Sequence, residues 1–116
     1  MTDMAINQIL AALAVDVKEF AVCEFTSESA IEIQPLDVIE IHYVLTGTLY
    51  LGMANGQCLE ARVGSVVLIP PHVKQIMGGS PTPSRIFTPA ETCSRRRDGL
   101  LHYNATMGDP SSVVVT

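Results

Sequence analysis

Short strand-like segments follow one another from Phe20 to residue 77, and glycine, proline or asparagine separates them about every ten residues. Val, Ile, Thr and Tyr fill these segments, because β-branched and aromatic side chains suit the pleated, half-buried surface of a sheet. The pattern predicts an all-β fold. The expected strands are 20–26, 29–33, 38–45, 47–53, 57–62, 65–69 and 73–77, with weaker candidates at 100–105 and 112–116.

Two local patterns place turns within this series. Asn55-Gly56 lies between two strand-like segments, and Asn-Gly readily adopts the positive φ angles of a hairpin turn. Pro70-Pro71 ends the strand 65–69, because proline cannot donate to a ladder and restricts the residue before it. We therefore expect a hairpin at the first site and a change of chain direction at the second.

The N-terminus has a different period. Ile6, Ile9, Leu10 and Leu13 recur at helical spacing, with Asp3 or Thr2 before them as an N-cap. A short amphipathic helix over residues 3–14 is the prediction.

The second half of the chain has a long stretch of a different composition. Residues 78–99 contain Gly-Gly-Ser, three prolines and an Arg-Arg-Arg run, which predicts a flexible loop. Residues 100–116 are expected to form the last strands. They end in Val-Val-Val-Thr without a turn or a polar tail, so we expect the natural chain to continue beyond Thr116 and this one to be truncated.

Length and composition narrow the class of protein. With 116 residues, 47% of them hydrophobic, the chain suits a single domain over 1–116. Its net charge of −5 has the wrong sign for a surface that binds nucleic acid. The three cysteines have no zinc or disulfide spacing, the first residues are unlike a signal peptide because Asp3 stands where such peptides carry Lys or Arg, and the sequence has no run of about 18 apolar residues. We expect a cytoplasmic protein that does not bind membranes.

Two segments carry a family resemblance. Glu40 is followed after six residues by Gly47, and Gly64 is followed after five residues by Pro70. These spacings resemble the end of the first and the start of the second cupin motif. The resemblance implies a small antiparallel cupin-type barrel or jelly roll, an architecture that can enclose a ligand cavity.

The resemblance does not extend to the metal ligands. Cupin metal sites use three histidines and the motif glutamate, but the histidine slots here hold Ile33, Pro35 and Gln75. One ligand of four cannot hold a catalytic metal, so we predict a metal-free cupin without a cofactor. An unusual metal site remains as an alternative of low weight. It would use Glu40, His42, His72 and His102.

The N-terminal segment makes the resemblance more specific. A helix, a strand with Val22-Cys23, and the motif segments 41–47 and 64–72 are together similar to the N-terminal domain of AraC-type transcription regulators. The similarity covers roughly residues 4–77. It implies a small-molecule effector, a homodimeric contact, and DNA binding only through a C-terminal domain that this chain does not contain.

Strand alternation predicts which side chains would line a cavity, because successive residues of a strand face opposite sides. Glu40, His42 and Gln75 are the polar groups expected inside an otherwise apolar barrel. The full candidate lining is Glu40, His42, Val44, Val73, Gln75 and Met77. A purely structural role, in which Glu40 and His42 bond each other or water, has equal weight.

Other side chains are expected to be structural. Phe20, Phe25 and Tyr43 suit the core, and Cys23 and Cys58 suit buried strand positions.

These observations favour a regulatory ligand-sensing domain rather than an enzyme, because no nucleophile elbow, phosphate loop or dinucleotide motif is present. The main alternative is a free-standing cupin enzyme, an isomerase or dioxygenase with a non-standard metal site. A third hypothesis is a dimerisation module whose barrel is filled by its own side chains.

Overall fold

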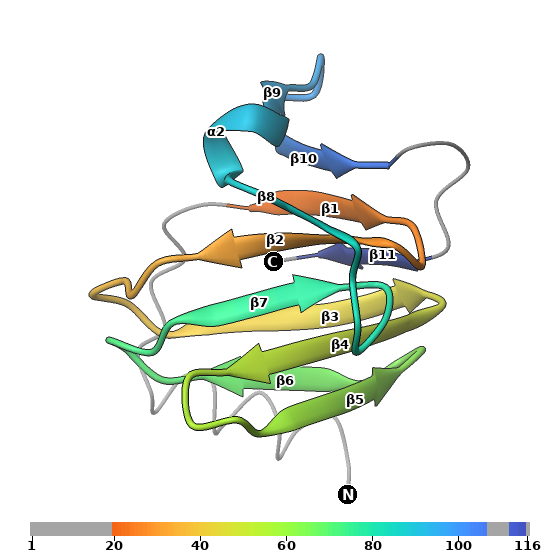
Figure 1. Ribbon diagram of the computed structural model, residues 1–116. Coiled ribbons are helices and arrows are strands. Elements are labelled where there is room, and N and C mark those ends of the chain that lie inside the picture. Colours follow the sequence, from red (N-terminus) through yellow and green to blue (C-terminus); the bar gives the residue numbers. More distant parts are fainter. Residues whose placement is uncertain (1–19, 107–111, 116) are drawn as a thin grey trace, which may run out of the picture.

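The structure is a computed structural model that describes residues 20–106 and, for the backbone alone, 112–115. The strands within it pack as two sheets (Figure 1). One sheet has the order β6-β3-β11-β1-β10-β9, and the other has the order β5-β4-β7-β2-β8. The strands are β1 (Ala21–Phe25), β2 (Ser29–Ile33), β3 (Glu40–Thr46), β4 (Thr48–Met53), β5 (Cys58–Arg62), β6 (Val66–Ile69), β7 (Gln75–Gly78), β8 (Arg85–Phe87), β9 (Cys93–Arg95), β10 (Leu101–Ala105) and β11 (Ser112–Val115).

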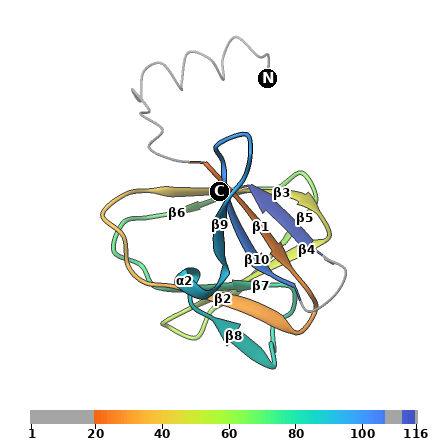
Figure 2. The same cartoon turned by 90° about the horizontal axis from the view of Figure 1, so that it is seen from above.

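The all-β prediction is confirmed, in the two-sheet jelly-roll form. Figure 2 shows β3 and β6 on one side of the molecule and β2, β7 and β8 on the other. Each strand expected from the sequence is present, with ends that differ by one or two residues. The helix expected over residues 3–14 lies outside the described residues, and no described helix is long and apolar enough to cross a membrane.

The core lies between the inner faces of the two sheets. Along β3, buried and exposed residues alternate, as period-two patterning requires. The same alternation on the facing strands produces one apolar cluster. Its buried members are Cys23, Phe25, Ile31, Val44, Leu49, Leu51, Ala61, Ile69, Met77 and Ala105.

The hairpin between β4 and β5 is confirmed. Gly56 has a φ of 85°, and its N–H donates to the carbonyl of Met53 over 3.0 Å. The side-chain oxygen of Asn55 accepts from the N–H of Gln57 at 2.9 Å, which is the local bond that makes asparagine a turn residue.

The flexible loop predicted for residues 78–99 is wrong. This stretch contains β8, the helix α2 (Pro89–Thr92) and β9. β8 pairs with β2 in parallel, and β9 pairs with β10 in an antiparallel arrangement. The backbone groups of β8 and β9 therefore find hydrogen-bond partners on these strands, although the composition of residues 78–99 does not favour strands. Thr88 and Glu91 form a capping box around Pro89, a local signal of a helix start that the sequence analysis passed over.

Some burial predictions also fail. Cys23 and Phe25 are buried, as expected, but Phe20, Tyr43 and Cys58 are exposed. On β1 the buried positions are Ala21, Cys23 and Phe25, which alternate along the strand, so the side chain of Phe20 faces the outer side of the sheet. Tyr43 falls on the outward phase of β3 in the same way.

Candidate functional site

The most polar part of the interior is formed by Glu40 and His42 on β3 and Gln75 on β7. β3 and β7 belong to different sheets, so these side chains meet across the interior. His42 and Gln75 have no exposed surface, and Glu40 is 8% exposed. We call these residues the buried polar trio.

Hydrogen bonds link the trio in series. The side-chain amide nitrogen of Gln75 donates to Oε1 of Glu40 over 2.9 Å. Oε1 of Gln75 lies 3.0 Å from Nε2 of His42. Because an amide oxygen can only accept, this arrangement places the proton of a neutral His42 on Nε2. The amide of Gln75 therefore connects a carboxyl group to an imidazole that lies 4.0 Å from it.

The surroundings favour uncharged forms of both ionisable groups. Burial raises the pKa of Glu40 above its ordinary value, and the hydrogen bond from Gln75 opposes this rise. Burial lowers the pKa of His42, again with Gln75 acting in the opposite direction. The trio thus presents a carboxyl group, an amide and an imidazole inside an apolar shell, which are groups that donate and accept hydrogen bonds without large charge.

The six residues predicted to line a cavity all face the interior. Val44 and Met77 are fully buried next to the trio on β3 and β7. Val73 precedes β7 and packs against the core while remaining partly exposed. The structure therefore brings these residues together, and their contact with a ligand stays a prediction.

The low-weight metal site of Glu40, His42, His72 and His102 does not assemble. Nδ1 of His72 lies 3.4 Å from Asp37 at the surface, and Nε2 of His102 lies 2.6 Å from Glu24. Within the described part of the chain, no group of three or more His, Cys, Asp or Glu residues is arranged to hold a metal ion. The side chains at the trio do not fit a cupin metal, because Glu40 and His42 alone supply too few ligands.

Comparison with known proteins decides the family. A family model described as "Cupin" matches residues 5–116. The chain belongs to the cupin family. No curated protein and no solved structure matches this cupin.

Two loops contact each other at the end of the cupin nearest Glu40. The N–H of His72 donates to the carbonyl of Leu36 over 2.7 Å, and its imidazole faces Asp37. His72 has a φ of 65°, a conformation that costs energy for a residue with a side chain.

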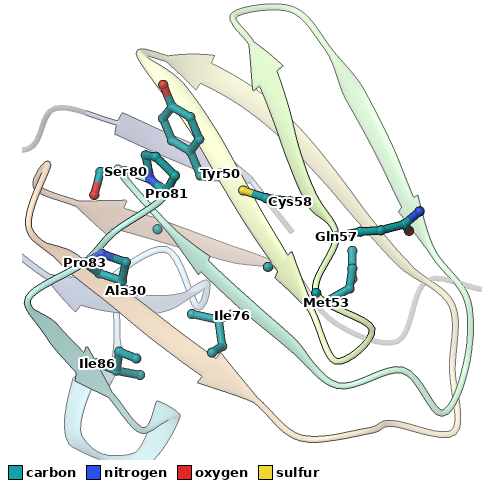
Figure 3. A pocket seen from close by; sticks show the side chains of 13 residues that line it. Ala30, Tyr50, Met53, Gln57, Cys58, Ile76, Ser80, Pro81, Pro83 and Ile86 are labelled. Atoms are coloured by element: carbon teal, nitrogen blue, oxygen red, sulfur yellow. The ribbon is translucent and has the colours of Figure 1, made fainter.

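A second feature that sequence reasoning missed is a hollow on the outer face of the five-stranded sheet (Figure 3). Its volume is about 280 Å³. Tyr50, Ile76 and Ile86 contribute side chains from three strands, and Pro81 and Pro83 lie along the segment that joins β7 to β8. No motif marks this hollow, because its walls come from strands that are distant in sequence.

Proposed function

We propose that this cupin is the ligand-sensing domain of an AraC-type transcription regulator in the cytoplasm, and that it is not an enzyme. Membership of the cupin family supports the proposal, as does the resemblance of segments 41–47 and 64–72 to that class of regulator. In this proposal a small organic effector binds between the sheets without a metal, and a homodimeric contact transmits the effect. DNA binding belongs to a C-terminal domain outside this chain.

The observation that carries the proposal is the buried polar trio. The histidine slots of the cupin motifs hold other residues, but a carboxyl group, an amide and an imidazole lie inside the apolar core, and a few polar groups among apolar side chains are typical of small-molecule sites. The matching effector has an apolar body with one hydrogen-bond donor for Glu40 and one acceptor for His42. The effector would replace Gln75 as their partner.

The same arrangement suggests how binding would be transmitted. Gln75 is the hydrogen-bond link between β7 of one sheet and β3 of the other. An effector that takes over its bonds changes how the two sheets are held together. It shifts the regulator between two states only by its difference in affinity for them, typically about 1–3 kcal/mol.

A thermal-shift screen of small organic acids, amides and phenols tests the proposal. A true effector raises the unfolding temperature, because a ligand at 100 times its Kd stabilises the folded state by about 2.7 kcal/mol. We expect Gln75→Met, which keeps the side-chain volume but removes the hydrogen bonds that the effector has to displace, to increase affinity for any hit. Cys58→Ser, an exposed change on the other side of the five-stranded sheet, is the matched control and should leave affinity unchanged.

Two outcomes would count against the proposal. If hits bind equally well to wild type and to Gln75→Met, the site lies elsewhere. If a broad library stabilises no form of the protein, the interior is filled by its own side chains and the domain is a dimerisation module.

A further inference from the structure

The outer surface of β3 and β6 is apolar over its whole breadth. Ile41 lies opposite Leu68, and Tyr43 lies opposite Val66, in the register of the two strands. Leu68 is 63% exposed and Ile41 is 43% exposed, although both are large hydrophobic side chains. We call this surface the apolar face; its members are Ile39, Ile41, Tyr43, Leu45, Val66 and Leu68.

The outward side of the same sheet carries polar groups on β1 and β10. On β1 and β10, Glu24 and His102 form a partly buried hydrogen bond, with 2.6 Å between Oε2 and Nε2. The apolar face is therefore not a general property of this sheet. Contiguous exposed hydrophobic residues of this kind mark a surface that another element covers.

We propose that the N-terminal segment of the same chain, residues 3–14, docks on the apolar face as an amphipathic helix. Its apolar positions Ile6, Ile9, Leu10 and Leu13 form one stripe, which suits a flat hydrophobic surface. The inference is independent of the proposed function, because it concerns the opposite side of the sheet from the polar trio.

The point at which this segment joins the sheet makes the docking feasible. Residue 20 leads directly into β1, and β1 is separated from β3 by β11 alone and lies three strands from β6. Neighbouring strands are about 4.8 Å apart, so β6 is about 14 Å away across the sheet. Residues 15–19 can span up to about 17 Å when extended, which exceeds that distance. Phe20, which is 53% exposed, adds an apolar side chain at the start of this path.

The tether also favours the segment over a second copy of the chain. A short flexible linker gives its two ends an effective concentration in the millimolar range. A second copy would have to reach a similar concentration to displace the segment from the apolar face.

A disulfide experiment on the full chain tests the contact. The background carries Cys58→Ser and Cys93→Ser, which remove the exposed thiols and leave the buried Cys23. Leu10→Cys and Leu68→Cys are then added, and dilute protein is oxidised mildly. We expect an intramolecular disulfide by mass spectrometry, formed at least about tenfold faster than in the control pair. In the control, Cys93→Ser and Leu10→Cys are introduced but Cys58 is kept, so the only exposed partner for the thiol at position 10 lies on the other sheet.

A second measurement does not depend on introduced thiols. Leu10→Glu places a charge in the apolar stripe, whereas Gln8→Glu places one on the opposite side of the same predicted helix. We expect Leu10→Glu to increase the fluorescence of a dye that binds exposed apolar surface at least about twofold, and Gln8→Glu to leave it unchanged. Circular dichroism confirms that both variants keep the β-sheet signal.

Three results would overturn the proposal. Equal rates of disulfide formation in the two pairs would show that the segment has no preferred position. An unchanged dye signal in Leu10→Glu would show that the segment does not cover the face. A wild-type dimer that Leu68→Glu converts to a monomer, while Leu10→Glu leaves it intact, would identify a second copy as the occupant.

Discussion

At the scale of single residues, the trio shows how one uncharged side chain can hold two ionisable groups in a core. Gln75 donates to Glu40 and accepts from His42, so each polar group has a partner. No buried side-chain nitrogen or oxygen within the described residues lacks a hydrogen bond. Removing any one member of such a network destabilises the folded protein, because the remaining groups stay buried away from water without a hydrogen-bond partner.

Replacing Gln75 by leucine should therefore be strongly destabilising. The change removes the partner of both Glu40 and His42, and each buried group left unpaired costs about 1–3 kcal/mol. We expect the free energy of unfolding in urea to fall by about 2–6 kcal/mol. Met77→Leu, at the next inward position of β7, is the control and should cost less than about 1.5 kcal/mol. Similar losses for the two variants would show that the hydrogen bonds contribute little.

Glu40 and His42 should make the free energy of unfolding depend on pH in opposite directions. The pKa of Glu40 is raised on folding from an ordinary 4.5, so its contribution is complete below pH 4.5 and is lost as the pH rises through the folded pKa. The pKa of His42 is lowered from 6.5, so its contribution is complete above pH 6.5 and is lost as the pH falls through the folded pKa.

Glu40→Gln separates these contributions. The variant keeps an acceptor for Gln75 but cannot ionise, so its stability relative to wild type should increase as the pH rises above 4.5. Urea unfolding of both proteins between pH 4 and 8 measures this difference. A difference that stays constant, or that falls with increasing pH, would contradict the raised pKa of Glu40.

His72 allows backbone strain to be measured apart from its side-chain contact. His72→Gly and His72→Ala both remove the imidazole that faces Asp37, but only glycine adopts a φ of 65° freely. We expect the glycine variant to exceed the alanine variant by about 1 kcal/mol in free energy of unfolding. Equal stabilities would mean that the loop relaxes out of this conformation.

At the scale of elements, the segment from β7 to β8 depends on close contact with the β1–β2 turn. The N–H groups of Ser84 and Arg85 both donate to the carbonyl of Glu28, at 2.9 and 3.0 Å. Gly78 and Gly79 begin this segment where the backbone approaches β2 most closely. A Cβ added at Gly78 would lie 2.6 Å from the carbonyl oxygen of Ser29.

Gly79→Ala should therefore destabilise the protein. The added methyl group would overlap the carbonyl of Thr26, so the backbone must shift, at a cost of about 1–3 kcal/mol. Gly52→Ala on β4 is the matched control, because its nearest atoms lie 3.9 Å away in ordinary contact. Thermal unfolding should show Gly52→Ala unchanged or more stable by up to about 1 kcal/mol. If Gly79→Ala is equally well tolerated, the close contact is not maintained in solution.

At the scale of the whole molecule, this cupin consists of two sheets joined by an apolar core, with one polar bridge between β3 and β7. The motif glutamate is present, but the side chains in the three histidine slots offer no imidazole. The molecule thus has a cupin framework whose interior holds a hydrogen-bonded network of Glu40, His42 and Gln75.

Metal addition should consequently leave stability unchanged. We expect Zn²⁺, Mn²⁺, Fe²⁺ and Ni²⁺ to leave the unfolding temperature of the wild-type protein unchanged, because the two side chains Glu40 and His42 supply too few ligands. Any increase should be the same in Glu40→Ala, which would show that the metal binds elsewhere. Elemental analysis of protein purified without chelators provides a second measurement. A stoichiometric metal that is lost in Glu40→Ala would overturn this expectation and favour a cupin enzyme.

Local patterns in the sequence were sufficient for the described strands other than β8 and β9, for the hairpin at Asn55-Gly56, and for the inward direction of Glu40, His42 and Gln75. Alternation along a strand is a property of neighbouring residues, so it can be read without knowing the fold. The tertiary structure decided the rest: the pairing of β8 and β9, the partners of His72 and His102, and the role of Gln75 as a bridge. Each of these depends on which distant strands become neighbours, and that is set by burial across the whole core.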